Sequence, residues 1–402
     1  MSFTQYQPTD FLITAEKSKT NYQDLTDSDI VTVDNGTVAF FDNWAQSGVY
    51  DEKGYICPAS VLLRGTTEVD SKNHKNFNSL DFIDQVVIYL GGSYFFQHFG
   101  HFLMEGINRL WACLVDEYKS KKVVIFLDND RNLPRFVREV LNAVGVSDDN
   151  IITIRKPTRF RRVFVPRQST DLLLYILPIT KKVYGRIADV LGHEKIKTYD
   201  KIYLSRGAMN DGRTFGEKSL ENIFTKNGYK IIYPETLPLA EQITLVHNCR
   251  ELAGTAGTAL HLAVFMKDGG RVVQIKRNST KADTITFQKN ICDLNNLDLV
   301  WVAGSVEKVP TPHYTRAPQI VGVTPYMIKF FDDNGFEYTK SDIAPDVTEF
   351  KRYTRQMRKY NAHMAYSKCM NVFIKLISLI GVNKSGRKFV REYLRRILKA
   401  RY

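Results

Sequence analysis

The chain has 402 residues, of which 44% are hydrophobic and 25% charged. This ordinary globular balance excludes a disordered or fibrous protein, and the length suggests two or three domains. The net charge of +13 is gathered in residues 351–402, which hold fifteen Lys or Arg and one acid, so that residues 1–350 carry −1. Because a nucleic-acid enzyme usually lines its working cleft with positive charge, this placement favours a basic appendage that sets location or recruits an acidic partner.

The cysteines and the first residues predict a cytosolic protein. Residues 1–10 are polar, without the basic start and apolar run of a secretory signal, and no stretch reaches the ~18 apolar residues of a membrane span. The cysteines are scattered, odd in number and without C-x-x-C spacing, which predicts reduced thiols. They are Cys57, Cys113, Cys249, Cys292 and Cys369.

Residues 1–85 read as short strands and turns. Asn35-Gly36 lies between β-branched residues, which predicts a hairpin because both residues tolerate positive φ. From residue 86 strands and helices alternate, which predicts a largely parallel sheet covered on both faces. The expected strands are 85–90, 123–127, 150–154 and 162–166, and the expected helices are 105–114, 134–144 and 179–191.

The alternation starts again near residue 200 and predicts a second α/β unit of comparable size. Its expected strands are 201–205, 229–233, 251–253, 271–275 and 297–302, and its expected helices are 219–227, 239–248 and 254–266. Two such units in series predict two Rossmann-like lobes facing a cleft. Beyond Pro325 we expect helices over 326–334, 347–365 and 371–380, and a basic amphipathic helix over 386–402.

A cluster of His98, His101 and Glu105 follows the first strand of the first unit. The spacing places all three on one helical face, where imidazoles and a carboxylate suit general acid–base catalysis near neutral pH. The structural alternative is a His–Glu pair that only caps a helix and forms hydrogen bonds with the backbone.

A second cluster follows a strand of the second unit, in the small-residue loop from Gly254 to His261. Such a loop lets backbone N–H groups approach a phosphate, and Thr255 and Thr258 add hydroxyl groups; tight strand–helix packing is the plainer alternative. Arg206 follows the first strand of this unit, where its planar fork could clamp a diphosphate.

Asp128-Asn129-Asp130 follows the strand that ends at Leu127. Two carboxylates at this spacing can bridge a metal ion to a diphosphate. Because the triplet is common in loops and Pro134 follows, a turn before a helix is the favoured interpretation.

The ordered set of these motifs resembles glycosyltransferase family 61 over residues 92–277. The motifs are His98-Phe99-Gly100-His101 with Glu105, Arg109 and Trp111, then Ser205-Arg206, Arg213, Glu217, Pro234-Glu235, Glu241-Gln242, and Gly254 through His261 with Phe265. The resemblance implies a GT-B-like fold and an inverting transfer from a nucleotide sugar, usually a UDP-sugar, without an obligatory metal. It places the donor on the second lobe and the glycan acceptor on the first.

We therefore expect an α/β protein with a β-rich segment (1–85), an acceptor-side lobe (86–195), a donor-side lobe (196–320) and a basic helical extension (321–402). The resemblance implies His101 and Glu105 as catalytic residues and His98 and Arg109 on the acceptor side. The implied donor-binding residues are Arg206, Arg213, Glu217, Glu241, Gln242, Gly254, Thr255, Gly257, Thr258 and His261.

The expected function is synthesis of a bacterial surface or capsular polysaccharide from an oligosaccharide or lipid-linked acceptor. Residues 351–402, with Phe389, Tyr393, Ile397 and Leu398 on one face of the last helix, would hold the enzyme at the anionic inner face of the plasma membrane. A basic helix packed on the protein is the alternative for this segment. For the whole chain three alternatives stay open: a metal-dependent transferase, an inactive glycan-binding scaffold (Ala256 stands where many relatives carry His) and a nucleic-acid-binding protein.

Overall fold

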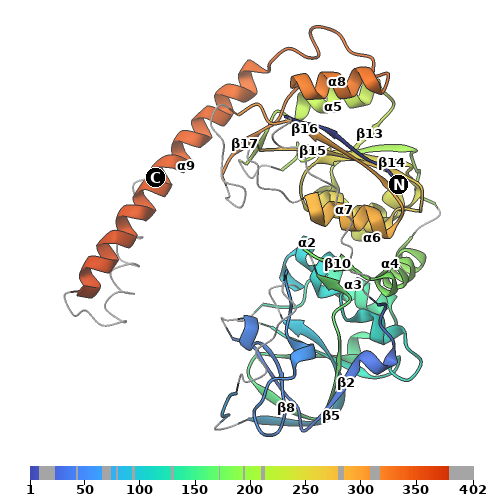
Figure 1. The fold of residues 1–402 in the computed structure, drawn as a ribbon, viewed down its shortest axis with the longest axis vertical. Coiled ribbons are helices and arrows are strands. Elements are labelled where there is room, and N and C mark those ends of the chain that lie inside the picture. The colour runs from blue at the N-terminus through green and yellow to red at the C-terminus, as the bar shows by residue number, and fades with distance from the viewer. Residues whose placement is uncertain are drawn as a thin grey trace.

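The structure is a computed structural model in which the described residues form two large β-sheets, each accompanied by helices, and two small two-stranded sheets (Figure 1). It describes residues 1–8, 23–41, 44–65, 74–77, 80–92, 96–127, 131–171, 173–192, 195–209, 213–278, 285–307 and 317–379. In this part of the chain no helix is long and apolar enough to cross a membrane. The expected α/β class is confirmed; the basic helix over 386–402 lies outside the described residues.

The six-stranded sheet is parallel throughout. Its order is β1 (Phe3–Tyr6), β16 (Asp298–Ala303), β15 (Arg271–Lys276), β14 (Glu251–Thr255), β11 (Lys201–Leu204) and β13 (Lys230–Ile232). When the strands other than β1 are numbered in chain order, their order across the sheet from β13 to β16 is 2-1-3-4-5. The direction of winding therefore reverses between β11 and β14. The crevice at the carboxyl ends of two such strands is where open α/β sheets bind ligands.

Helices cover both faces of this sheet (Figure 1). α5 (Glu217–Lys226) and α8 (Pro325–Asp333) bury Phe224 and Phe330 against the outer face. The inner face is covered by α6 (Leu239–Asn248), α7 (Ile285–Leu294) and the 3₁₀ helix η9 (Thr258–Phe265). The strands between them are buried on both faces, which explains their continuous apolar sequences.

The seven-stranded sheet is mixed, with the order β4-β3-β8-β5-β6-β7 and β2 also paired to β8. β5 (Asp81–Gly92) pairs in parallel with β6 (Lys122–Phe126) and β8 (Thr158–Pro166), and β6 with β7 (Ile151–Ile154). The winding reverses between β5 and β8, which makes the carboxyl ends of these two strands the second candidate crevice. β2 (Ile30–Asp34), β3 (Thr37–Ala39) and β4 (Gly48–Tyr50) add the antiparallel part.

The predicted hairpin at Asn35-Gly36 is wrong. β2 and β3 both pair with β8, one after the other, and Asn35 (φ 51°) makes a kink between them. The Asn35 N–H donates to Arg161 O and the Phe160 N–H to Gly36 O, so the ladder continues across the kink. The hairpin is instead formed by β3 and β4.

The predicted helix over 105–114 is also irregular. It consists of a single turn α2 (Phe99–His101), a π-helical turn η5 (Phe102–Gly106) and a 3₁₀ helix η6 (Leu110–Leu114). α3 (Arg135–Ala143) and α4 (Pro178–Leu191) agree with the sequence. The remaining elements are η2 (Asp27–Asp29), η3 (Trp44–Gln46), η4 (Pro58–Ser60), η7 (Asp148–Asn150), β9 (Thr170–Asp171), β10 (Tyr175–Ile176), β12 (Thr214–Phe215), η8 (Pro234–Thr236) and β17 (Gln319–Ile320).

The helices between the two sheets pack against one another through one continuous hydrophobic cluster. Tyr184 of α4 meets Phe265 of η9 edge to face at 5.5 Å, and its hydroxyl donates to Leu103 O at 2.7 Å. Gly100 lies so close to Thr258 that an added Cβ would come within 2.6 Å of the threonine methyl. The two candidate crevices are therefore joined by direct packing.

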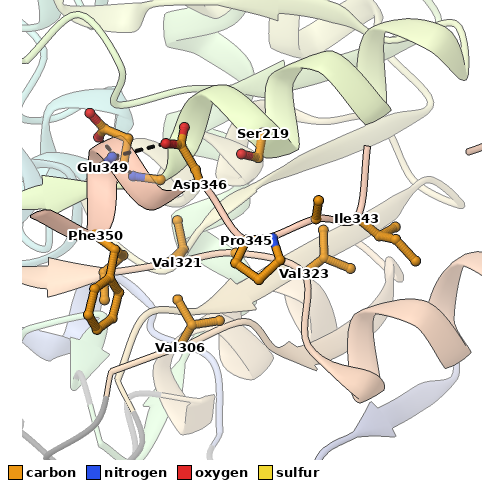
Figure 2. A pocket seen from close by; sticks show the side chains of 13 residues that line it. Ser219, Val306, Val321, Val323, Ile343, Pro345, Asp346, Glu349 and Phe350 are labelled. Carbon is orange, nitrogen blue, oxygen red and sulfur yellow. Dashed lines mark hydrogen bonds between the residues drawn. The ribbon is translucent and has the colours of Figure 1, made fainter. Parts of the chain in front are cut away.

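The C-terminal helix α9 (Val347–Leu379) is a single helix where the sequence predicts two. Its first turns bury Tyr353 against Phe215 and Ile320, and the helix then runs away from both sheets (Figure 1). A 240 Å³ pocket lies beneath its start, lined chiefly by apolar side chains such as Val306, Val321 and Phe350 (Figure 2). None of the predicted site residues lines this pocket.

Candidate functional site

The segment after β5 brings the predicted acid–base residues together. His98 is exposed at the start of α2, and its ring centroid lies 4.9 Å from that of His101. The side chain of His101 is 27% exposed, whereas that of Glu105 is 1% exposed. Nδ1 of His101 lies 2.5 Å from Oε2 of Glu105. A carboxylate that is buried behind a half-exposed imidazole can orient the ring, which leaves the imidazole as the group able to reach a substrate.

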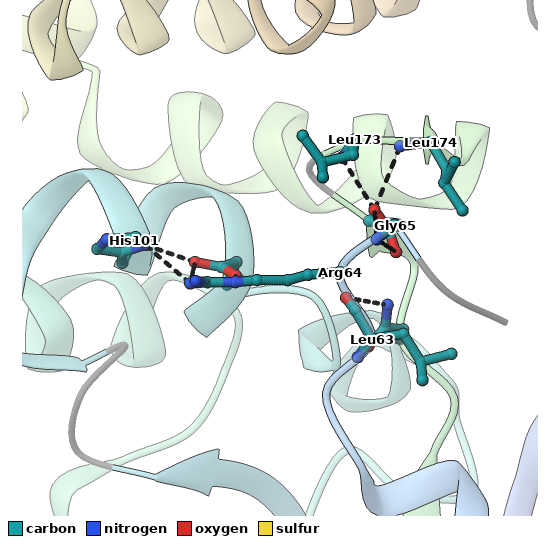
Figure 3. Close-up of polar contacts among 9 residues, drawn as sticks. Leu63, Arg64, Gly65, His101, Leu173 and Leu174 are labelled. Atoms are coloured by element: carbon teal, nitrogen blue, oxygen red, sulfur yellow. Dashed lines mark hydrogen bonds and ion pairs between the residues drawn. The ribbon is translucent and has the colours of Figure 1, made fainter. Parts of the chain in front are cut away.

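Sequence reasoning missed Arg64, which completes this group (Figure 3). Its guanidinium donates to both carboxylate oxygens of Glu105, from Nε to Oε1 and from Nη2 to Oε2, the latter at 2.5 Å. The same Nη2 lies 3.2 Å from Nδ1 of His101. Arg64 comes from the loop after η4, remote in sequence from the histidines, so no local spacing could have revealed it.

The predicted phosphate loop lies at the carboxyl end of β14. Gly254 is a packing glycine, because a Cβ there would lie 2.7 Å from Leu204 O of the neighbouring strand. Thr255 is buried, and its hydroxyl donates to Glu217 at 2.7 Å. Gly257 and Thr258, at the start of η9, are partly exposed. The small residues therefore serve both interpretations: some allow close packing, and others leave backbone accessible.

Two arginines flank Gly257. A Cβ on Gly257 would lie 3.5 Å from Nη1 of Arg206 and 3.4 Å from Nη2 of Arg277. Arg206 follows β11 and also donates from Nε to Thr214 at 3.2 Å. Arg277 follows β15, and its strand-end position is the signal that could have singled it out. Two guanidinium groups beside a glycine loop provide a positively charged surface suited to a phosphate.

Glu217 lies behind this surface. Its carboxylate is buried and accepts hydrogen bonds from the hydroxyls of Tyr203 and Thr255, both at 2.7 Å. Burial raises the pKa of Glu217, while these hydrogen bonds and the charges of Arg277 and Arg206 lower it. The residue therefore supports the loop and the arginines, and is not itself placed to touch a donor.

His261 of η9 lies on the side of the loop that faces the first unit. Burial lowers the pKa of His261 to about 4. Its Nδ1 lies 3.4 Å from Oε1 of Gln288, and its ring meets Phe287 edge to face at 4.5 Å. The neutral ring can donate or accept one hydrogen bond, which suits contact with a hydroxyl more than with a diphosphate.

A 540 Å³ cleft lies where the two units meet. From the first unit it is lined by residues of α2 and α3, and from the second by the segments that follow β11 and β13, the start of α6 and the start of η9. The lining includes Phe99, Phe136, Arg206, Gln242, Thr258 and Ala259. Gln242 uses its amide to hold the turn before α6, donating to Pro234 O at 2.8 Å and Leu237 O at 2.9 Å.

Arg109 does not reach a surface. It is 2% exposed and donates to Pro166 O at 3.0 Å and to Ala59 O and Ser60 O at 3.0 and 3.1 Å. The guanidinium therefore joins β8 to η4 by hydrogen bonds. Its place on the acceptor side, which the resemblance implies, stays a prediction. Arg213 and Glu241 stand on the exposed approach to β12 and on the first turn of α6. Neither lines the cleft, and neither do His98, His101, Glu105, Gly257 or His261.

Asp128 and Asp130 lie outside the described residues. Elsewhere in the described chain, no group of three His, Cys, Asp or Glu is placed to hold a metal ion. The five cysteines are all free thiols.

Residues 99–273, which form most of the cleft and its surroundings, match the family model described as Glycosyltransferase 61. This match supports an enzyme that transfers sugars, a glycosyltransferase. Within that class it supports family 61, in agreement with the resemblance of the motifs. No curated protein matches the chain.

Proposed function

We propose that the chain is an inverting glycosyltransferase that moves a sugar from a nucleoside diphosphate donor, a UDP-sugar, to a hydroxyl of a glycan. The observation that carries this proposal is the meeting of two strand-end crevices. One holds His101 with Glu105, the other holds Arg206 and the Gly254–His261 loop, and Gly100 packs directly on Thr258. We take the two units to be GT-B-like lobes, with the donor in the cleft on the side of the six-stranded sheet.

In the proposed reaction the acceptor oxygen forms a bond to the anomeric carbon of the donor as the bond from that carbon to the diphosphate breaks. The hydroxyl proton passes to His101, and the electron pair leaves on the diphosphate. Arg206, Arg277 and the backbone N–H groups at the start of η9 would stabilise the departing charge. This arrangement supplies positive charge without an obligatory metal.

Calorimetric titration with UDP, GDP and CMP, with and without EDTA, tests the donor proposal. We expect UDP to bind in both conditions. Binding that requires a divalent ion would move the proposal to a metal-dependent transferase using Asp128 and Asp130. Binding of none of the three would favour the inactive scaffold.

Replacing His101 tests the catalytic assignment. Loss of a general base typically slows a reaction by about 10²–10⁴-fold, so we expect His101→Ala to lose turnover on this scale while UDP affinity stays within about two-fold. UDP-sugar turnover and UDP titration on the same preparations make the comparison. A variant that keeps most of its turnover would remove His101 from this role.

We further propose that α9 and the residues after it bind an anionic membrane surface beside a lipid-linked acceptor, as in assembly of a bacterial surface or capsular polysaccharide. From 351 to 369 the exposed part of α9 carries Lys and Arg and no acid. Because Tyr353 is buried against the sheet, a deletion should begin after residue 360. We expect the full chain to pellet with anionic vesicles and the variant without residues 361–402 not to. Neither protein should pellet with neutral vesicles. Equal pelleting of the two proteins with anionic vesicles would contradict the proposal.

A further inference from the structure

The loop that carries Arg64 is held in place from both sides (Figure 3). Asp171, which is 1% exposed, accepts the N–H of Gly65 on both carboxylate oxygens at 3.0 and 2.9 Å. Its Oδ1 also accepts the N–H groups of Leu173 at 2.9 Å and Leu174 at 3.2 Å. On the other side, Gln168 exchanges two hydrogen bonds with the backbone of Leu63, at 2.9 and 3.1 Å.

This clamping matters because Arg64 has to reach across to another element. Gln168 and Asp171 follow β8, whereas His101 and Glu105 follow β5, so the clamp links the two strand ends on either side of the crevice. A long arginine side chain loses less conformational freedom when its own backbone is already fixed. The hydrogen bonds to residues 63 and 65 therefore preorganise the contact with Glu105.

The donors and acceptors of this group determine where the proton of His101 lies. A guanidinium can only donate, and an ionised carboxylate can only accept. Nδ1 of His101 lies 2.5 Å from Glu105 and 3.2 Å from Arg64, so the shorter contact is the hydrogen bond and requires a proton on Nδ1. The lone pair of the neutral ring is then on Nε2.

We propose that Arg64 is a positioning residue that balances the charge of buried Glu105 and keeps His101 neutral, with the proton on Nδ1 and Nε2 ready to accept one. Asp171 and Gln168 place Arg64 for this task. The inference rests on the proposed function only in treating His101 as the base. Its structural content, the protonation of the His101 ring, concerns the protein without substrate.

The charge balance gives Arg64 an effect that packing alone would not have. Without the guanidinium, His101 would be the partner able to carry positive charge that the described part of the chain places on the buried Glu105 carboxylate. An unpaired buried charge is costly, so the ring would hold a second proton and could no longer act as a base. Among the described residues, other titratable groups near His101 are His98, at 4.9 Å between ring centroids, and His261.

Nitrogen NMR of protein labelled with ¹⁵N-histidine tests this directly, with His101→Asn to assign the signals. At about pH 8, above the usual titration of histidine, we expect wild-type His101 to show a pyrrole-type Nδ1 and a pyridine-type Nε2. In Arg64→Met we expect both nitrogens to become pyrrole-type, as in an imidazolium. Arg64→Lys should restore part of the wild-type pattern. Unchanged His101 signals in Arg64→Met would overturn the inference.

Matched variants separate this role from a structural one. Arg162→Met removes an arginine that pairs with Asp34 on the exposed surface of β8, and should leave the His101 signals unchanged. Asp171→Asn should shift them in the same direction as Arg64→Met but by less, and wild-type signals in this variant would remove Asp171 from the proposal.

We expect Arg64→Met to bind UDP within two-fold of wild type. A wild-type protein that fails to bind UDP counts against the proposed function, whereas the NMR result decides the role of Arg64 alone.

Discussion

Several side chains around the cleft hold other parts of the protein in place by hydrogen bonds. Glu217 holds the hydroxyl of Thr255, and Gln242 holds the carbonyls of the turn before α6. Each of these residues stands in a motif of the sequence, yet the structure gives them supporting positions. A motif can therefore identify a site correctly and still leave open which of its members face a ligand.

His261 should make the stability of the protein depend on pH. Its pKa is lowered in the folded protein to about 4, so the unfolded chain binds the proton more readily. The free energy of unfolding should therefore be highest above about pH 6.5 and should fall by about 1–3 kcal/mol as the pH decreases from there toward 4. Urea denaturation at several pH values in this range measures the effect.

The variant His261→Asn should show a flatter decrease between these pH values than the wild type. His363→Gln, which changes an exposed histidine of α9, is the control and should follow the wild-type curve. Equal slopes for His261→Asn and wild type would contradict the assignment.

Some elements could be predicted from the sequence, and others depended on contacts distant along the chain. Apart from β1, the strands of the six-stranded sheet are short apolar runs ended by Gly, Pro or polar residues, and their positions agree with the sequence within a few residues. Asn35-Gly36 misled because a kink and a hairpin need the same backbone freedom, and only the partner strand β8 decides between them. The π-helical turn at Glu105 likewise has no marker in the sequence.

The first strand is an element whose role could not be predicted. β1 closes the edge of the six-stranded sheet by pairing with β16, whereas β2 and β3, which follow it in the chain, pair with β8 of the other sheet. Tyr6 is 9% exposed and meets Phe330 edge to face at 5.6 Å. The residues before the first unit thus stabilise the second.

Shortening this side chain should therefore destabilise the second unit. We expect Tyr6→Ala to lower the free energy of unfolding by about 2–4 kcal/mol, the range for removing a large buried side chain. Val31→Ala, at a more exposed position of β2, should change it by less than about 0.5 kcal/mol. Urea denaturation followed by tryptophan fluorescence compares the variants, and similar losses for both would contradict this role of β1.

At the scale of the whole molecule, the candidate site lies where two reversals of winding face each other. The alternation of strands and helices in the sequence predicts that each unit has such a crevice, and the motifs lie at the strand ends. It does not predict that residues of α2 and η9 touch, because that contact depends on the packing of α4, η6 and η9. Arg64 was missed for the same reason, because it joins the site through a tertiary contact.

The contact between Gly100 and Thr258 provides a test of this arrangement. In Gly100→Ala the new Cβ would lie 2.6 Å from the methyl and 2.8 Å from the hydroxyl of Thr258, so the loop beside Arg206 must shift. We expect UDP affinity to fall about ten-fold, or about 1.4 kcal/mol, which lies within the usual cost of overpacking.

A double-mutant cycle with Thr258→Ala separates the contact from other effects. Thr258→Ala removes the methyl and hydroxyl groups that the new Cβ would meet, so adding Gly100→Ala to it should cause little further loss of UDP affinity. The coupling energy should then be close to the loss in Gly100→Ala alone. Independent, additive losses would mean that the two units do not meet at this point in solution, and the proposed cleft would need a different arrangement of its walls.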